Sequence, residues 1–235
     1  MRVFDYNMPR RTRQSYLWHS KHEDYLEHVK EANKNIEYVL ENYKPVLLYS
    51  GGKDSLVLLH MVMQHTTDVP VYYHDYGYDY ESEQKKMPED FTKEILEIAY
   101  EAGAEHIHIS NPSSTDFFGQ LFKYMEKEGL NLELLGIRGG ESITRKDRVK
   151  GSLVRKEGVR TLAFPIRYLT TDDIWAYLVS NNVRYLSYYD YYARLDGYDK
   201  VRFTIRFSNG LLHNGGSKYI DGVLLNDYRN EQPKR

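Results

Sequence analysis

The chain has 235 residues, of which 41% are hydrophobic and 28% are charged, and its formal net charge is -2. This composition is typical of a globular protein with a sizeable core, and the charge gives no overall attraction to nucleic acid or membranes. The sequence contains no cysteine, which excludes disulfides, thiolate metal sites, iron–sulfur clusters and cysteine-based catalysis. It has neither an apolar run approaching the roughly 20 residues of a membrane span nor a signal-peptide core, so we expect a cytoplasmic protein.

Apolar strands and amphipathic helices alternate along most of the chain. Strands are expected at residues 46–50, 69–75, 105–110, 132–136 and 160–166. Helices are expected at residues 20–43, 53–65, 88–102, 115–127 and 170–182. Ser20 is the candidate N-cap of the first helix, and a threonine is the N-cap of the last. This alternation predicts a doubly wound, parallel, five-stranded sheet of the Rossmann-like α/β class.

The same pattern divides the chain into three parts. Residues 1–44 form an N-terminal arm and helix, and residues 45–183 form the α/β domain. After about residue 184 the alternation gives way to sequence rich in Tyr, Gly and Asn. We therefore expect residues 184–235 to be an irregular C-terminal extension.

The segment SGGKDS, residues 50–55, separates two apolar runs at the point where the first strand ends and a helix begins. Glycines in such a turn allow unusual φ angles and a close approach of the backbone to a ligand. Backbone N–H groups, the helix dipole, a lysine and two serine hydroxyls all suit an oligophosphate at this edge of the sheet. The candidate phosphate-binding residues are Ser50, Gly51, Gly52, Lys53, Asp54 and Ser55. Asp54 is either a Mg²⁺ ligand or a helix-capping residue.

Two common phosphate loops are excluded. A Walker A loop requires glycine where this chain has Leu47, and no GxGxxG is present. SGGKDS instead resembles the PP-loop of the N-type ATP pyrophosphatases, which include GMP synthetases, ATP sulfurylase small subunits and phosphoadenylyl-sulfate (PAPS) reductases. The resemblance implies a sheet of the adenine nucleotide α-hydrolase type and binding of ATP, or a PAPS-like adenine nucleotide, with Mg²⁺.

A second segment, HDYGYDYESE at residues 74–83, is similar to the D-T-G-x-x-F-P-E stretch of PAPS reductases and ATP sulfurylase small subunits. Asp75, Gly77 and Glu81 match that stretch, while Tyr76 replaces its Thr and Tyr80 its Phe. The resemblance implies that the three matching residues lie at the nucleotide site.

Two further segments occur in the order of that family. LLGIRGGESITR, residues 134–145, is similar to G-x-R-x-x-E-S-x-x-R, which implies that Gly136 lies at the site and that Arg138 and Arg145 contact phosphate or sulfate. The segment at 164–190 resembles the family's P-I-x-x-W-T-x-x-D-I-W stretch together with its later P-x-Y sequence.

Departures from the family pattern limit the activity that we expect. Leu169 replaces a Trp, Leu186 lies near the usual Pro, and the cysteine that accepts the sulfonate in PAPS reductases is missing. Neither Ser nor Tyr replaces a thiol in forming an S-sulfo intermediate, so thioredoxin-linked reduction is not expected. FMN adenylyltransferases of the same family also lack a catalytic cysteine.

The expected reaction is therefore adenylyl transfer. An acceptor attacks the α-phosphorus of ATP and pyrophosphate leaves, with Lys53, Arg138 and Arg145 as the residues implied to stabilise charge. The expected partners are a small-molecule nucleotide and an acceptor that the sequence leaves undefined, with no membrane. Two alternatives stay open: a nucleotide-binding regulatory protein without catalysis, and an enzyme that adenylylates nucleic acid. Assembly into a homo-oligomer is also left open.

Residues 138–160 contain eight basic and three acidic residues, in contrast to the near-neutral chain. One interpretation is a loop over the anionic end of the nucleotide. For residues 146–156 a solvated surface loop is an equal alternative. A third interpretation is contact with nucleic acid.

Overall fold

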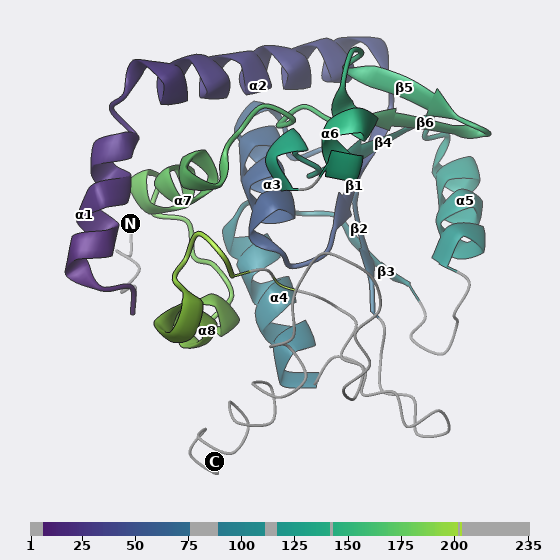
Figure 1. Ribbon diagram of the computed structural model, residues 1–235. Coiled ribbons are helices and arrows are strands. Elements are labelled where there is room, and N and C mark those ends of the chain that lie inside the picture. The colour runs from purple at the N-terminus through teal and green to yellow at the C-terminus, as the bar shows by residue number, and fades with distance from the viewer. Residues whose placement is uncertain (1–6, 76–88, 111–116, 142, 202, 204–235) are drawn as a thin grey trace.

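The strands expected from the sequence form one sheet in the computed structural model, which describes residues 7–75, 89–110, 117–141, 143–201 and 203 (Figure 1). The strands are β1 (Pro45–Tyr49), β2 (Val71–His74), β3 (Ile107–Ser110), β4 (Leu132–Leu135), β5 (Val154–Glu157) and β6 (Arg160–Ala163). Their order is β3-β2-β1-β4-β6-β5, and only the β5–β6 pair is antiparallel. The doubly wound α/β class is therefore confirmed.

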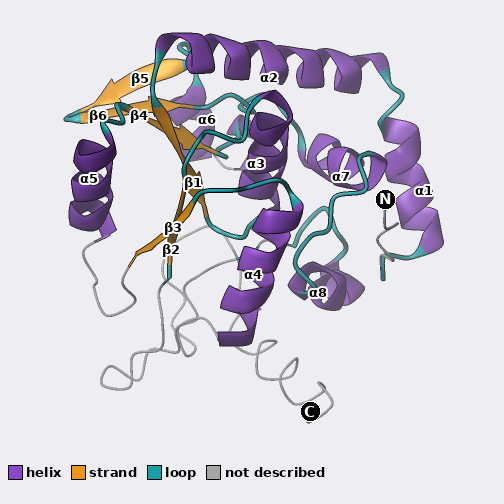
Figure 2. Cartoon of the chain, turned by 180° about the vertical axis from the view of Figure 1, so that it is seen from behind, coloured by secondary structure: helices purple, strands orange, loops and turns teal. Residues whose placement is uncertain are grey.

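Helices cover both faces of this sheet, as the two opposite views show (Figures 1 and 2). They are α1 (Arg10–His19), α2 (Glu23–Asn42), α3 (Lys53–His65), α4 (Glu89–Glu101), α5 (Phe117–Glu128), α6 (Ile143–Val149), α7 (Thr171–Ser180) and α8 (Tyr188–Asp196), with a short 3-10 turn η1 (Gly139–Glu141). No helix in the described ranges is both long and apolar enough to cross a membrane.

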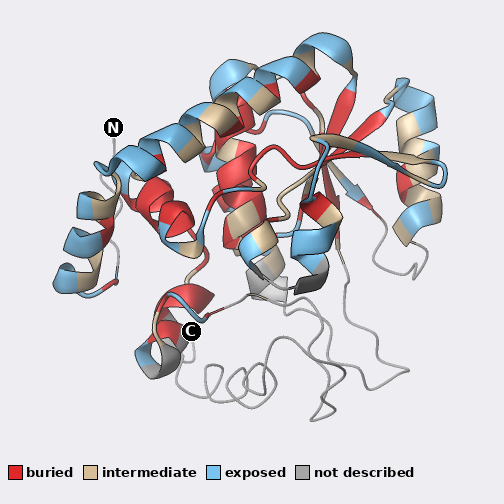
Figure 3. Ribbon diagram, turned by 45° about the horizontal axis from the view of Figure 1, so that its top comes forward, coloured by how far each residue is buried: buried red, intermediate tan, exposed pale blue. Residues whose placement is uncertain are grey.

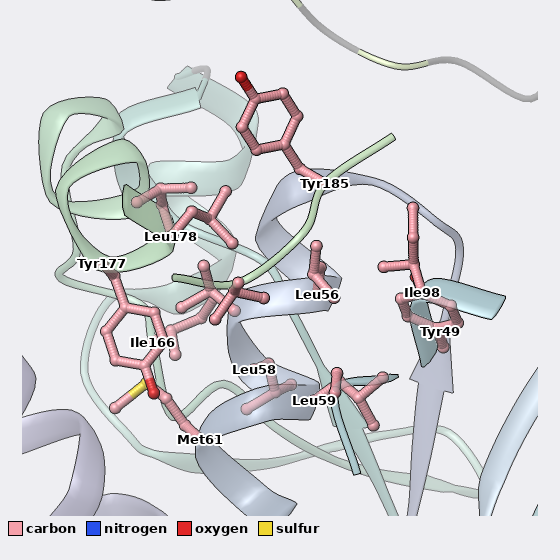
Figure 4. Packing of buried hydrophobic residues seen from close by; sticks show 14 of the residues in the cluster. Tyr49, Leu56, Leu58, Leu59, Met61, Ile98, Ile166, Tyr177, Leu178 and Tyr185 are labelled. Atoms are coloured by element: carbon pink, nitrogen blue, oxygen red, sulfur yellow. The ribbon is translucent and has the colours of Figure 1, made fainter. Parts of the chain in front are cut away.

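The strand β1 is buried on both faces because its side chains alternate between two clusters. Leu47 and Tyr49 join the main core, to which α3, α4 and α7 contribute, whereas Val46 packs with Leu121 of α5. The burial pattern in Figure 3 follows this arrangement, with α3 and α7 buried along most of their length. In Figure 4, Leu56 and the rest of α3 lie between β1 and α7, so the site-bearing end of α3 is fixed from two sides.

The sixth strand was not expected from the sequence. The strand β5 lies within the basic stretch and pairs with β6 in a hairpin in which Glu157 is opposite Arg160. It is an edge strand whose side chains are mostly charged, and charges are a common protection of sheet edges against aggregation. A charged edge strand has no apolar alternation, so the sequence pattern did not reveal it.

The N-terminal region contains two helices instead of the one expected. The helix α1 has few apolar residues, and Tyr16 is its only buried one. The prediction of Ser20 as an N-cap is wrong: Ser20 is the C-cap of α1, and α2 begins at Glu23 after an N-cap at His22. The segment between the helices makes a corner that lays α1 against α7 (Figure 1).

The expectation of an irregular chain after residue 184 is corrected for its first part. The helix α8 lies there, and Tyr185, Leu186, Tyr188 and Tyr189 belong to the main core. The sequence failed here because tyrosine does not separate an apolar face from a polar one. Residues 204–235 lie outside the described residues, and the proposed boundaries at residues 44 and 183 stay a prediction.

The threonine cap of α7 is confirmed, and it forms part of a larger cluster. The Thr170 hydroxyl accepts a hydrogen bond from the Asp173 N–H at 3.1 Å, and the Asp173 carboxylate accepts one from the Thr170 N–H at 2.7 Å. That buried carboxylate is also bonded to His19 Nε2 of α1 at 2.6 Å and to His28 Nδ1 of α2 at 2.8 Å. Burial alone would raise the pKa of Asp173, but its hydrogen bonds outweigh burial and lower it. Asp173 therefore joins three helices as a carboxylate.

Replacing Asp173 by Asn should destabilise the protein by about 1–3 kcal/mol at neutral pH, since Asn keeps one acceptor oxygen but leaves buried partners unsatisfied. Because folding lowers the Asp173 pKa, its contribution is present above the ordinary aspartate pKa and is lost as pH falls below it. The free energies of unfolding of parent and variant, measured with urea, should therefore converge as the pH falls from about 5 to about 3. Asp172→Asn, at an exposed neighbour, should change stability by less than about 0.5 kcal/mol. An Asp173→Asn deficit that does not depend on pH would contradict this account.

Candidate functional site

The SGGKDS loop, residues 50–55, lies at the carboxyl end of β1 and leads into α3 (Figure 1). In the sheet β1 lies between β2 and β4, and the chain winds away from β1 in opposite directions on its two sides. In open α/β sheets, ligands bind at this switch point outside the carboxyl ends of the strands. The loop therefore occupies the position that the sequence analysis expected for a binding site.

Only one of the two loop glycines is needed for its backbone conformation. Gly51 has φ of 80°, and a Cβ there would lie 2.6 Å from the Ile95 side chain of α4. Gly52 is the N-cap of α3 with an ordinary φ of -70°. The unusual φ that the sequence analysis expected in this turn is therefore found at Gly51 and not at Gly52.

The loop is further fixed by its serines. The Ser55 hydroxyl donates to the Gly52 carbonyl at 2.9 Å and lies 3.1 Å from the Ser50 hydroxyl. The Ser50 N–H lies 3.3 Å from the Ser55 hydroxyl oxygen, which accepts its hydrogen bond. These bonds close the turn, so the serines shape the loop.

Asp54 joins the two cations that the sequence analysis selected. Its Oδ1 accepts a hydrogen bond from Arg138 Nε at 2.6 Å, and its Oδ2 lies 3.4 Å from Lys53 Nζ. Lys53 is 3% exposed and Arg138 is 1% exposed. Arg138 Nη1 also donates to the carbonyl oxygen of Leu169 at 3.1 Å, which ties the segment before α7 to the site. We call Lys53, Asp54 and Arg138 the charge cluster.

The charge cluster keeps Asp54 ionised. Burial alone would raise the pKa of Asp54, but the Lys53 ammonium and the Arg138 guanidinium outweigh it and lower that pKa. Both carboxylate oxygens are thus engaged with cations, which does not fit a role as Mg²⁺ ligand. The N-cap of α3 is Gly52 and Asp54 is the second residue of the helix, so Asp54 is not its N-cap residue either. Among the described residues, no group of three or more His, Cys, Asp or Glu side chains could hold a metal ion.

Gly136 makes the closest backbone approach of the site. A Cβ at Gly136, just past β4, would lie 2.7 Å from Ser55 Cα and 2.8 Å from Ser55 N. Because these are backbone atoms of α3, they have little freedom to move aside. Glycine here lets β4 and the first turn of α3 come together, which brings Arg138 within reach of Asp54.

Other predicted site residues have more scattered positions. Asp75 follows β2 at the same edge of the sheet, where its Oδ1 lies 3.5 Å from the Thr92 hydroxyl. Gly77 and Glu81 lie outside the described residues. Arg145 is exposed on α6, within the region that follows η1.

The structure also assigns contacts to part of the basic stretch. Arg148 and Arg155 pair with Glu157, at 2.7 Å and 3.6 Å, and Arg160 pairs with the buried Glu133. These three arginines therefore stabilise the β5–β6 hairpin and its neighbours. Other cationic side chains of the stretch are exposed on the surface, namely Arg145, Lys146, Lys150 and Lys156.

Tyr189 contacts the loop and was not selected from the sequence. Its hydroxyl accepts a hydrogen bond from the Lys53 N–H at 2.9 Å, and its ring centroid lies 5.7 Å from Lys53 Nζ. The residue lies 136 positions away in a run of tyrosines, where no spacing distinguishes one ring from the next. Only the packing of α8 reveals its place at the site.

Comparison with known proteins agrees with this arrangement. The model of the phosphoadenosine phosphosulfate reductase domain matches residues 44–201, more than half of the chain. This chain belongs to that family. A search of curated proteins finds no match.

The structure of this family member is similar to that of FMN adenylyltransferase from Candida glabrata, with a TM-score of 0.57 and 13% identity over 77% of this chain and 65% of that one. The same enzyme in complex with ATP gives the same values. Yeast FAD synthetase is similar with a TM-score of 0.51 and 15% identity, over 76% of this chain and 68% of that one. At these identities the likeness shows the fold alone, and the chain spans less than two thirds of the Candida glabrata enzyme.

Replacing Gly136 by Ala should destabilise the protein by about 1–3 kcal/mol, because the new methyl group would press against the backbone of α3. Gly140→Ala is the matched control, since the nearest atom to its Cβ is Arg138 Nη1 at 3.9 Å. Chemical denaturation of both variants measures the difference. Equal stability of Gly136→Ala and the parent would show that β4 and α3 are not in this close contact.

Proposed function

We propose that this chain binds an adenine nucleotide, ATP or a PAPS-like molecule, with its phosphates at the SGGKDS loop. The observation that carries the proposal is the buried Lys53 at the N-terminus of α3, at the switch point of a sheet in a member of this family. The helix dipole and the backbone N–H groups of the first turn favour an oxyanion there. Lys53 adds a cation at the same place.

Each predicted residue has a part in this proposal. Asp54 positions Lys53 and Arg138, and because its two carboxylate oxygens face these cations, a Mg²⁺ ion that accompanies the nucleotide would not be held by Asp54. Gly136 and Arg138 form the floor of the phosphate site, and Arg145 is proposed to contact the anionic end from α6. The remaining proposed contacts are those of Ser50, Gly51, Gly52, Ser55, Asp75, Gly77 and Glu81.

The proposed reaction is adenylyl transfer. A nucleophilic oxygen or nitrogen of the acceptor forms a bond to the α-phosphorus, the bond to the bridging oxygen breaks, and pyrophosphate leaves with the electron pair. Lys53 and Arg138 stabilise the charge that develops on the phosphate oxygens, and positioning supplies the rest. No protein nucleophile takes part, which agrees with a chain that has no cysteine. The fold shared with FMN adenylyltransferase supports this reaction class and leaves the acceptor open.

A second candidate is an enzyme that adenylylates nucleic acid. The exposed Arg145, Lys146, Lys150 and Lys156 favour it, because cationic side chains on the surface suit binding to a phosphate backbone. Salt-dependent binding of RNA or DNA would distinguish this candidate from transfer to a small molecule.

Lys53→Ala should weaken ATP binding more than tenfold, since a charge-assisted contact to phosphate contributes roughly 1.5–3 kcal/mol. Calorimetry with Mg²⁺ and ATP measures the affinity, and labelled ATP with candidate acceptors reveals AMP-linked product. Lys34→Ala, at an exposed position on α2, is the control and should bind as the parent does. Equal affinity of Lys53→Ala and the parent would refute the phosphate assignment. Binding without any product would favour a regulatory protein.

The family's named chemistry gives a further test. Purified protein supplied with PAPS and reduced thioredoxin should release no sulfite, because the chain has no thiol to accept the sulfonate. Sulfite release that disappears in the Lys53→Ala variant would show that this chain is a reductase after all. An authentic PAPS reductase in the same assay is the positive control.

A further inference from the structure

Tyr189 faces the two groups of Lys53 that are proposed to bind phosphate, its backbone N–H and its side-chain ammonium. The hydroxyl of Tyr189 accepts the Lys53 N–H at 2.9 Å, and its ring lies beneath the Lys53 ammonium, with 5.7 Å between Nζ and the ring centroid. The hydroxyl oxygen thus stands where a phosphate oxygen at the N-terminus of α3 would bind. A backbone N–H has a single hydrogen to donate, so hydroxyl and phosphate compete for it.

Tyr189 is held in this place by an anchored helix. The residue before α8, Ser187, donates to the two carboxylate oxygens of Glu94 on α4 through its N–H and its hydroxyl, both at 2.8 Å. The buried Asp190 accepts hydrogen bonds from the hydroxyls of Tyr185 and Tyr198. Movement of Tyr189 is therefore coupled to the rest of α8 and, through Ser187 and Glu94, to α4.

Trp175 of α7 packs against Tyr189 and Tyr198, and we call these three rings the aromatic cluster. Its ring is 5.3 Å from the Tyr189 ring and 5.0 Å from the Tyr198 ring, and its indole N–H donates to the Tyr198 carbonyl at 2.6 Å. The other tryptophan, Trp18, is 67% exposed on α1. Trp175 is thus a built-in reporter of what happens to Tyr189.

We infer that Tyr189 is a positioning residue of the phosphate site, which occupies the Lys53 N–H until a nucleotide phosphate displaces its hydroxyl. The inference rests on the proposed function, because it takes the SGGKDS loop as the phosphate site. It assigns to α8 a task in the site: occupancy of the loop is transmitted to α8 through the hydrogen bond between the Lys53 N–H and the Tyr189 hydroxyl. A phosphate ligand must do without that bond or break it, which lowers its apparent affinity.

Tyr189→Phe separates this competition from a purely structural role. Phenylalanine keeps the ring beneath the Lys53 ammonium and removes only the competing hydroxyl. ATP affinity should rise about two- to tenfold, the equivalent of one ordinary hydrogen bond. Without nucleotide the variant should melt below the parent, because the Lys53 N–H has lost its acceptor; at saturating ATP the difference in melting temperature should shrink, because phosphate supplies the acceptor.

Tyr198→Phe is the matched control. It removes a hydroxyl from the same aromatic cluster, the one that donates to Asp190 at 2.6 Å, and leaves the loop untouched. Its melting temperature should fall by the same amount with and without ATP, and its ATP affinity should stay within about twofold of the parent. An independent reading comes from Trp18→Phe, in which Trp175 emission alone should change as ATP is added.

The outcomes are distinct. If ATP binds the parent and Lys53→Ala abolishes binding, but Tyr189→Phe binds ATP equally or more weakly and its melting deficit is unaffected by ATP, the inference is overturned and the proposed function stands. An unchanged Trp175 emission at saturating ATP also overturns it. If the parent binds neither ATP nor PAPS by calorimetry, the proposed function fails and the inference fails with it.

Discussion

The site depends on one interaction, the Asp54 carboxylate held between the Lys53 ammonium and the Arg138 guanidinium. Two buried cations without a counter-charge would be strongly destabilising, and the ionised Asp54 carboxylate supplies that counter-charge. The same contacts fix the geometry, because Arg138 follows β4, Asp54 lies in the first turn of α3, and the Leu169 carbonyl precedes α7. The charge cluster thus joins three separate segments of the chain at the carboxyl edge of the sheet.

The rest of the architecture supports that junction. Gly136 allows β4 to approach α3, Gly51 allows the loop to turn, and the His19–Asp173–His28 cluster holds α1 and α2 against α7. Beyond the edge, α8 contributes the Tyr189 hydroxyl to the first turn of α3. The site thus brings together the loop after β1, the first turn of α3, the segment after β4, the segment before α7, and α8.

Much of the fold could be predicted because its signals are local. The five parallel strands are apolar runs between helical periods, and the SGGKDS loop and the Thr170 cap are short motifs with a fixed structural setting. The parts that escaped prediction lack such signals: β5 is charged because it is an edge strand, and α8 is buried on its tyrosines. Pairing partners across the chain, such as Asp173 with two histidines or Lys53 with Tyr189, follow from tertiary packing, which no sequence period encodes.

The central claim is that the phosphates of an adenine nucleotide bind at residues 50–55. The most direct test is a crystal structure of the full chain with Mg²⁺ and an ATP analogue that carries a methylene group between the α- and β-phosphates. The account predicts phosphate oxygens within hydrogen-bonding distance of the Lys53 ammonium and of the N–H groups at the start of α3. A nucleotide bound elsewhere on the molecule, with no phosphate contact to residues 50–55, would contradict it.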